Sequence, residues 1–372
     1  MTLDDLRRAA VARSLFPPTT LPRALDVLGF VQADPVRAPA RAQDLTLRHR
    51  VTGYRAGDLE RCYPRLDVHE DFFVNYGFVT GAVQALMHPR GGRAPWTAAR
   101  GRHVRALLDF VRMHGSVHPR EVDEHFSHGT VTNYWGGSSS ATTHLLDAMH
   151  YRGLLRVMRR EAGIRIYAAH EHEAGPRDAA TRRAHLDALV DVIVRNHAPL
   201  PAASLSSLVR RLRFAVPQWA RELERTLQRA RRRLAFARVE GVDWYWPATP
   251  TFADAAPQDL VRLLAPFDPV VWDRRRFENP LGLGLSLRGV HAGGQAQARL
   301  LRAATPVARP CRRLGKRLAE ERGASIGPRL RRVVPAAGSG VWSRARGRAT
   351  SSAPISQSRR LTPRPRPPGR SC

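Results

Sequence analysis

The sequence lacks the features of several protein classes. No apolar run approaches the about 18 residues of a membrane-spanning helix, so we expect no membrane protein. Three cysteines without a CxxC pair exclude a disulfide scaffold and a zinc finger. The chain starts with acidic residues and no apolar segment, so we expect no secretory signal and a cytoplasmic, nucleoid-associated protein.

Acidic side chains are scarce throughout, and aromatic side chains are scarce near the end. The chain has 61 Lys and Arg against 32 Asp and Glu, a formal net charge of +29, which favours a polyanionic partner. Residues 281–372 contain 20 basic and 2 acidic side chains, with Trp342 as their single aromatic residue. Such a segment cannot offset its ordering entropy, so residues 279–372 are predicted to be disordered or frameshifted.

Two explanations of this tail stay open. One is a natural Arg-rich arm that binds nucleic acid. The other is a frameshift, because codon degeneracy allows the segment from Asn279 onward to read RWAWAYRFEAY one base later, which alternates like a strand. We favour the frameshift and take no functional evidence from the charge of the tail.

Three stretches repeat one pattern, helices followed by a short β-ribbon. The pattern predicts a mainly α chain with small β wings (α+β), built from tandem winged-helix domains. The expected domains are residues 1–95, 96–175 and 176–250. Residues 251–278 would begin a C-terminal β-barrel that is otherwise lost to the tail.

The clearest copy covers residues 97–168. Thr97 is expected to cap its first helix, and a hairpin should turn at residues 161–163. In a winged helix the third helix and the wing contact DNA. The candidates here are Trp135, Ser138, Arg156, Arg159, Arg160 and Arg165.

The copy at 180–247 predicts further contacts. Ser204 is expected to cap one helix, and Pro217 to open a long helix that ends at Arg233. Arg231 and Arg232 would suit DNA phosphates, although a solvated basic helix end explains them equally well.

Residues 30–35, FVQADP, carry the candidate chemistry. Pro35 biases Asp34 away from the helical region, and residues two apart in an extended segment share a face. Gln32 and Asp34 should therefore point the same way, with Val31 and Ala33 inward. An amide beside a carboxylate can hold a water, and the carboxylate can stabilise a positive charge. A simple turn cap remains the alternative.

Two motifs resemble the crosslink-repair DNA glycosylase family, the YcaQ-like winged-helix DNA-binding proteins. The first is FVQAD at 30–34 followed by Arg41-Ala42 and LRHR at 47–50, and the second is APFDPVVWDRRR at 265–276. The resemblance covers about residues 3–278. It implies Gln32 and Asp34 as the catalytic pair. We add the basic side chains of both motifs, Arg48, Arg50, Arg274, Arg275 and Arg276, to the candidate DNA contacts.

The resemblance implies a monofunctional DNA glycosylase, a hydrolase that cleaves the N-glycosidic bond of alkylated or crosslinked purines in double-stranded DNA. No cofactor is implied, we expect a monomer, and the aberrant C-terminus could leave this version inactive. The aromatic and acidic segment 68–76 only loosely resembles its counterpart in the family. No catalytic role is therefore given to His69.

Two other functions stay open. A non-catalytic winged-helix DNA-binding protein, such as a transcription regulator, would share the fold. A damaged gene product would bind nucleic acid only through its Arg-rich end. No metal site is expected, because HEHE at 170–173 is interpreted as a short exposed linker without further ligands.

Overall fold

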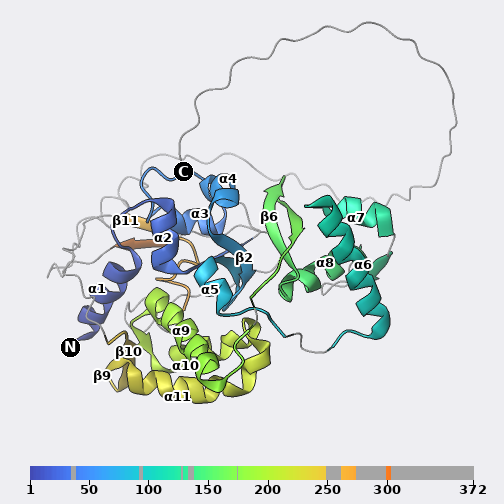
Figure 1. The fold of residues 1–372 in the computed structure, drawn as a ribbon. Helices are drawn as coiled ribbons and strands as arrows, with labels where there is room; N and C mark the ends of the chain where they lie inside the picture. The colour runs from blue at the N-terminus through green and yellow to red at the C-terminus, as the bar shows by residue number, and fades with distance from the viewer. Residues whose placement is uncertain are drawn as a thin grey trace, which may run out of the picture. The chain divides into compact units, whose positions relative to one another are not determined.

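The computed structural model describes residues 1–34, 39–91, 95–126, 129–132, 138–173, 175–248, 261–273 and 299–302 (Figure 1). All of them belong to one compact unit, Met1–Thr305. Helices alternate with small antiparallel sheets, which confirms the predicted α+β class. Strand β12 (Arg299–Arg302) pairs with β11 (Val261–Leu264). The prediction of a disordered or frameshifted tail stays a prediction, and apart from these four residues the segment 279–372 lies outside the described residues.

Local capping starts the first two helices. Helix α1 (Leu3–Ser14) begins with a capping box in which the Thr2 side chain and the Asp5 carboxylate each bind the other residue's backbone N–H. Helix α2 (Leu21–Leu28) is capped by the Thr20 hydroxyl and ends at Gly29, whose φ of +67° suits glycine. The chain then enters β1 directly.

A three-stranded antiparallel sheet of order β1-β3-β2 forms the centre of the N-terminal segment. Its strands are β1 (Phe30–Gln32), β2 (Val68–Phe72) and β3 (Tyr76–Thr80). Short helices surround it: α3 (Ala42–Leu47), α4 (Asp58–Cys62), a 3-10 turn at Tyr63–Arg65 and α5 (Gly81–Ala85).

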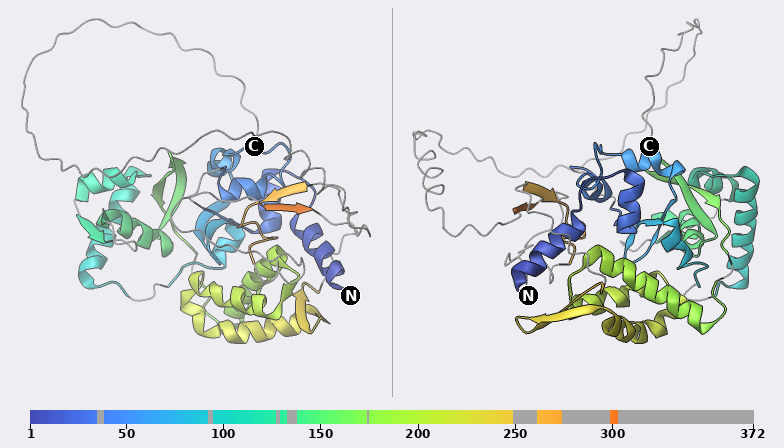
Figure 2. Two further views of the ribbon diagram at one scale, coloured as in Figure 1. Left: turned by 180° about the vertical axis from the view of Figure 1, so that it is seen from behind. Right: turned by 60° about the vertical axis from the view of Figure 1, so that its left-hand side comes forward.

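The middle segment shows the predicted order of helices and hairpin. Its elements are α6 (Ala98–His114), α7 (Pro119–Phe126), β4 (Thr130–Thr132), β5 (Ser138–Ser140), α8 (Ala141–Tyr151), β6 (Leu155–Glu161) and β7 (Ile164–Ala169). Thr97 caps α6 as predicted, and the hairpin turns through Ala162 and Gly163, both at positive φ. In Figures 1 and 2 the β6–β7 hairpin lies between β2 and helices α6–α8.

The third segment packs three helices against a second small sheet of order β8-β10-β9. Its elements are α9 (Ala179–His197), β8 (Leu200–Pro201), α10 (Ala202–Arg211), 3-10 turns at Leu212–Phe214 and Pro217–Glu222, α11 (Leu223–Arg233), β9 (Ala235–Val239) and β10 (Val242–Trp246). Asp178 caps α9.

Two capping predictions in this segment are wrong. Ser204 lies inside α10 and is buried, because the helix starts two residues earlier, after Pro201. Pro217 opens a 3-10 turn with a kink at Trp219, so α11 starts at Leu223. At Ser204 the apolar packing of α10 overrides the local cap signal.

Strand β1 lies between two hydrophobic cores. The Phe30 ring packs edge-on against Phe73 with centroids 5.4 Å apart, in a core that also includes buried residues of α9, α10 and α11. Val31 packs with α2 and with apolar residues of the middle segment. Because successive side chains of a strand point to opposite faces, a three-residue strand can join both cores. The end of this strand is where the candidate catalytic pair lies.

Candidate functional site

Gln32 is the last residue of β1, and it pairs with Gly77 of β3. A Cβ atom at position 77 would lie 2.3 Å from the Val31 carbonyl oxygen and 2.9 Å from the Gln32 Cα. Real Cβ atoms essentially never approach other atoms this closely, so glycine is required for β1 and β3 to meet here. The glycine therefore helps to set the position of Gln32.

Asp34 follows β1 and is half-buried. The Asp34 backbone N–H donates to Oε1 of Gln43 on α3 at 3.4 Å. One residue earlier, the Ala33 N–H donates to the Tyr76 carbonyl at 3.1 Å. The main chain that carries the two candidate catalytic side chains is thus tied to β3 on one side and to α3 on the other.

Gln32 is more enclosed than the sequence predicted. Its side chain was expected to point outward together with that of Asp34, with Val31 and Ala33 inward, yet Gln32 is 7% exposed. Its Oε1 accepts a hydrogen bond of 2.7 Å from the Trp272 indole N–H. The open placement is wrong for most of this side chain, because a tryptophan 240 positions away in the sequence covers it. That Gln32 and Asp34 share a face stays a prediction.

Trp272 brings two basic groups to the pair. The His197 ring centroid lies 5.4 Å from that of Trp272, and the Arg211 guanidinium lies 5.4 Å from the centroid of the indole. Arg211 also donates from Nε to the Val74 carbonyl at 2.8 Å. Burial and then the charge of Arg213 lower the pKa of Arg211. His197 and Arg211 thus contact the indole that covers Gln32.

The segment that carries Trp272 is fixed by a buried ion pair. Asp268 and Arg50 are both fully buried, with Arg50 N–H groups 2.7 and 2.9 Å from the two Asp268 oxygens. Arg50 also donates to the Ser14 and Thr46 carbonyls. Arg50 was predicted to contact DNA, and this prediction is wrong in the structure, because its guanidinium is occupied inside the protein.

Two of the predicted wing contacts are also occupied internally. Arg160 binds both oxygens of Glu70. Arg165 binds Asp147 at 2.7 Å and lies over the Tyr76 ring. These arginines connect the β6–β7 hairpin to β2 and β3, and their contacts with DNA phosphates stay a prediction.

The remaining predicted DNA contacts differ in placement. Arg159 is exposed and pairs with the exposed Glu161, while Arg156 is half-buried. Arg232 and Arg48 are exposed, and Arg231 is half-buried beside Ser206. Ser138 lies in β5, but its side chain, Trp135 and Arg274, Arg275 and Arg276 lie outside the described residues.

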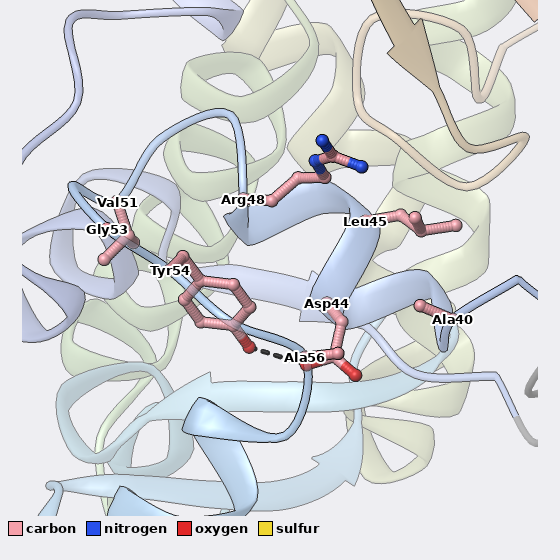
Figure 3. A pocket seen from close by; sticks show the side chains of 8 residues that line it. All are labelled: Ala40, Asp44, Leu45, Arg48, Val51, Gly53, Tyr54 and Ala56. Atoms are coloured by element: carbon pink, nitrogen blue, oxygen red, sulfur yellow. Dashed lines mark hydrogen bonds between the residues drawn. The ribbon is translucent and has the colours of Figure 1, made fainter.

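A pocket of about 400 Å³ lies between α3 and the loop that follows it (Figure 3). Arg48 stands at its rim, and Tyr54 forms one wall. The Tyr54 hydroxyl donates to the buried Asp44 carboxylate at 2.7 Å. Asp44 also accepts the Gly57 N–H at 3.0 Å, so this carboxylate fixes the loop beside the pocket.

Sequence reasoning missed a buried polar network centred on β2. Burial opposes ionisation of Glu70, but Arg160 outweighs it and lowers the pKa of the carboxyl. Arg90 and His88 do the same for the fully buried Asp71 and lower its pKa well below its usual range. The sequence signal was a pair of acidic residues in a segment rich in aromatic residues. Acidic side chains that are buried in such a segment need charged or hydrogen-bonding partners.

The histidines of the segment 170–173 join this network. The His172 ring stacks on His88 with centroids 4.3 Å apart, and His170 lies 4.2 Å from His172. Burial, reinforced by neighbouring histidines, lowers the pKa of His170 to about 4 and that of His172 to about 3. The prediction of an exposed linker is wrong for His172, because its ring packs against His88.

Among the described residues, no group of three or more His, Cys, Asp or Glu side chains is arranged to hold a metal ion. Within the same residues, no helix is both long and apolar enough to cross a membrane.

Comparison with known proteins now places the chain. Residues 25–282 match the AlkZ-like DNA glycosylase family, which is more than half of the chain. Among solved structures, the DNA glycosylase AlkZ of Streptomyces sahachiroi is similar, with a TM-score of 0.54 and 15% sequence identity over 82% of this chain and 86% of that chain. At this identity the likeness concerns the fold. No curated protein matches the sequence.

The chain therefore belongs to the AlkZ-like DNA glycosylases, a family of DNA repair enzymes. The family match extends over both motifs on which the resemblance in the sequence rested, residues 30–50 and 265–276. It confirms that resemblance. Gln32, Asp34 and Trp272 all lie inside the matched range.

Proposed function

We propose that this protein is a monofunctional DNA glycosylase that hydrolyses the N-glycosidic bond of alkylated or crosslinked purines, with Gln32 and Asp34 as its catalytic pair. The observation that carries the proposal is the position of these residues at the end of β1. Their backbone is held by β3 and α3, and Trp272, which Arg211 contacts, donates a hydrogen bond to Gln32.

The chemistry follows from the leaving group. A purine alkylated at N7 or N3 is cationic, so it needs little acid catalysis to depart. The enzyme must stabilise the oxocarbenium-like sugar and direct a water to C1′. The electron pair of the breaking bond neutralises the purine, and Asp34 takes the proton that the water loses. A carboxylate in this role follows the logic of glycoside hydrolysis.

The scarcity of amine side chains in the sequence favours a hydrolytic reaction over a lyase reaction. A glycosylase that also cleaves the strand needs an amine to form a Schiff base with the sugar. The whole sequence contains one lysine, Lys316, in the Arg-rich end, and every other basic residue of the Lys and Arg set is arginine. Guanidinium groups stay protonated and are poor nucleophiles. Side-chain amines are thus limited to Lys316, and water is the nucleophile that we propose.

For the DNA interface we propose three winged-helix units, residues 1–95, 96–175 and 176–250, followed by the start of a barrel at 251–278. Arg48, Arg159 and Arg232 are its described candidates, since all three are exposed. Trp135 and Arg274–Arg276 stay predictions from the sequence.

The direct test is base release from duplex DNA that contains N7-methylguanine. The full-length protein should release the base, and Asp34→Asn should lower the single-turnover rate about 100- to 10,000-fold, as loss of a general base does. Asp26→Asn is the matched control, because Asp26 lies exposed on α2. It should keep the rate of the unmodified protein. Borohydride should trap no covalent complex with DNA.

Two results would reject the proposal. One is equal base release by the Asp34→Asn variant and the unmodified protein. The other is tight binding of duplex DNA without any base release, which would favour the non-catalytic DNA-binding alternative. The deep burial of Gln32 is the observation that favours a non-catalytic DNA-binding protein.

A further inference from the structure

We propose that Trp272 is a positioning residue that fixes the Gln32 amide so that its N–H groups, and not its oxygen, are presented to the reaction. The inference rests on the proposed glycosylase function and refines the role of Gln32 within it. It is carried by the hydrogen bond from the Trp272 indole to Gln32 and by the contacts that hold Trp272 in place.

The orientation of the amide follows from the chemistry of its partner. An indole N–H only donates, so the atom 2.7 Å from it must be the oxygen of the amide. This removes the usual ambiguity between the oxygen and the nitrogen of a glutamine. Among the described residues none accepts a hydrogen bond from Gln32 Nε2. This nitrogen is also not among the fully buried side-chain atoms that lack a hydrogen-bond partner. Gln32 therefore offers two N–H donors to whatever lies next to it.

Trp272 is itself held from three sides. The His197 ring at the end of α9 and the Arg211 guanidinium on α10 contact the indole. Four residues earlier, Asp268 anchors the segment through its buried pair with Arg50, and the Trp272 N–H donates to the Asp268 carbonyl at 2.8 Å. The indole can therefore impose an orientation on the amide and is not merely drawn to it.

Strand β1 is tied to the same helix end. Asn196, next to His197, donates from Nδ2 to the Phe30 carbonyl at 3.0 Å. The last turn of α9 thus contacts both β1, through Asn196, and the Trp272 indole, through His197. This common support fixes the distance between donor and acceptor without any contact from the ligand.

The fixed orientation of the amide gives Gln32 and Asp34 different roles. Gln32 can donate to the oxygen of the attacking water or to a sugar or phosphate oxygen, but it cannot accept a proton. Asp34 is then the acceptor for the proton of the water. A donor held in place before the reaction is worth more than one that must reorient, because the reorganisation has already occurred in folding.

The test is a double-mutant cycle on base release from N7-methylguanine DNA. Trp272→Phe keeps the ring and removes the N–H, and should lower the single-turnover rate about 3- to 10-fold, the size of one hydrogen bond. In a Gln32→Ala background the same substitution should have no further effect. Trp219→Phe is the matched control, since Trp219 is also a partly buried tryptophan packed on the same core, and its rate should not change.

A second readout uses the free protein. The indole N–H resonance of Trp272, assigned by its loss in Trp272→Phe, should shift in Gln32→Ala and stay in place in Asp26→Asn. An unmoved resonance would overturn the contact. Equal slowing by Trp272→Phe in both backgrounds, or no slowing, would overturn the positioning role. Absence of base release from the unmodified protein would instead reject the proposed function, with the resonance still deciding the contact.

Discussion

The buried pair of Arg50 and Asp268 gives a prediction for the stability of the fold. We consider Asp268→Ala, which removes the carboxylate and leaves the Arg50 guanidinium fully buried. Arg50 would keep its bonds to the Ser14 and Thr46 carbonyls but lose both bonds to Asp268. The Val270 N–H would lose its acceptor as well.

The expected cost is large because a buried charge is left without its counter-ion. Breaking one partner of a buried pair costs about 3–5 kcal/mol. For a folded unit of this size, about 2–4 °C of melting temperature accompanies each kcal/mol, so a loss of roughly 6–20 °C is expected. Urea unfolding followed by circular dichroism would measure the free energy of unfolding directly.

A control and a rescue make the result specific. Asp243→Ala removes the partner of Arg238 from an exposed pair and should cost less than about 1 kcal/mol. The double variant Arg50→Met with Asp268→Leu replaces the pair by apolar side chains and should recover most of the loss. If Asp268→Ala cost no more than Asp243→Ala, the role of this pair as the anchor of residues 265–273 would be refuted.

Two further predictions concern the network around β2. The lowered pKa values of His170 and His172, about 4 and about 3 against an ordinary 6.5, mean that the unfolded chain binds more protons in this range. Stability should therefore fall as the pH falls from about 6.5 to about 4, and replacing both histidines with Asn should flatten urea midpoints measured across that window. Arg160→Met should cost about 1–3 kcal/mol, because the buried Glu70 loses both hydrogen bonds from Arg160 and keeps the Tyr76 hydroxyl at 2.6 Å and the Arg165 guanidinium at 3.8 Å. The salt dependence of DNA binding should stay unchanged. Arg159→Met should leave the free energy of unfolding unchanged and weaken the salt dependence of DNA binding. A weakened salt dependence in Arg160→Met would show that the Arg160 side chain contacts phosphates.

Local features were predictable from the sequence because their causes lie within a few residues. The Thr97 cap and the turn at Ala162 and Gly163 each depend on one side chain or one backbone conformation. Where apolar packing competes with a cap signal, as at Ser204, the local signal loses.

The candidate site was predictable only in its residue types. The pair Gln32 and Asp34 and the motif of 265–276 stand in the sequence, but the contact between them spans 240 positions. No periodicity reports such a contact. The enclosed amide of Gln32 and the loss of Arg50 as a DNA contact both follow from this one long-range packing event, so both predictions failed together.

The three residues of β1 have a consequence for how mutations spread. Phe30 and Val31 insert into different hydrophobic cores, and the chain leaves the sheet at the next residue. A cavity opened in either core can shift the strand by a fraction of an ångström, and the strand has no length over which to absorb that shift. Substitutions far from the pair, in the buried faces of α2 or α10, should therefore alter turnover as well as the melting temperature. The position of the catalytic pair therefore depends on how tightly both cores are packed.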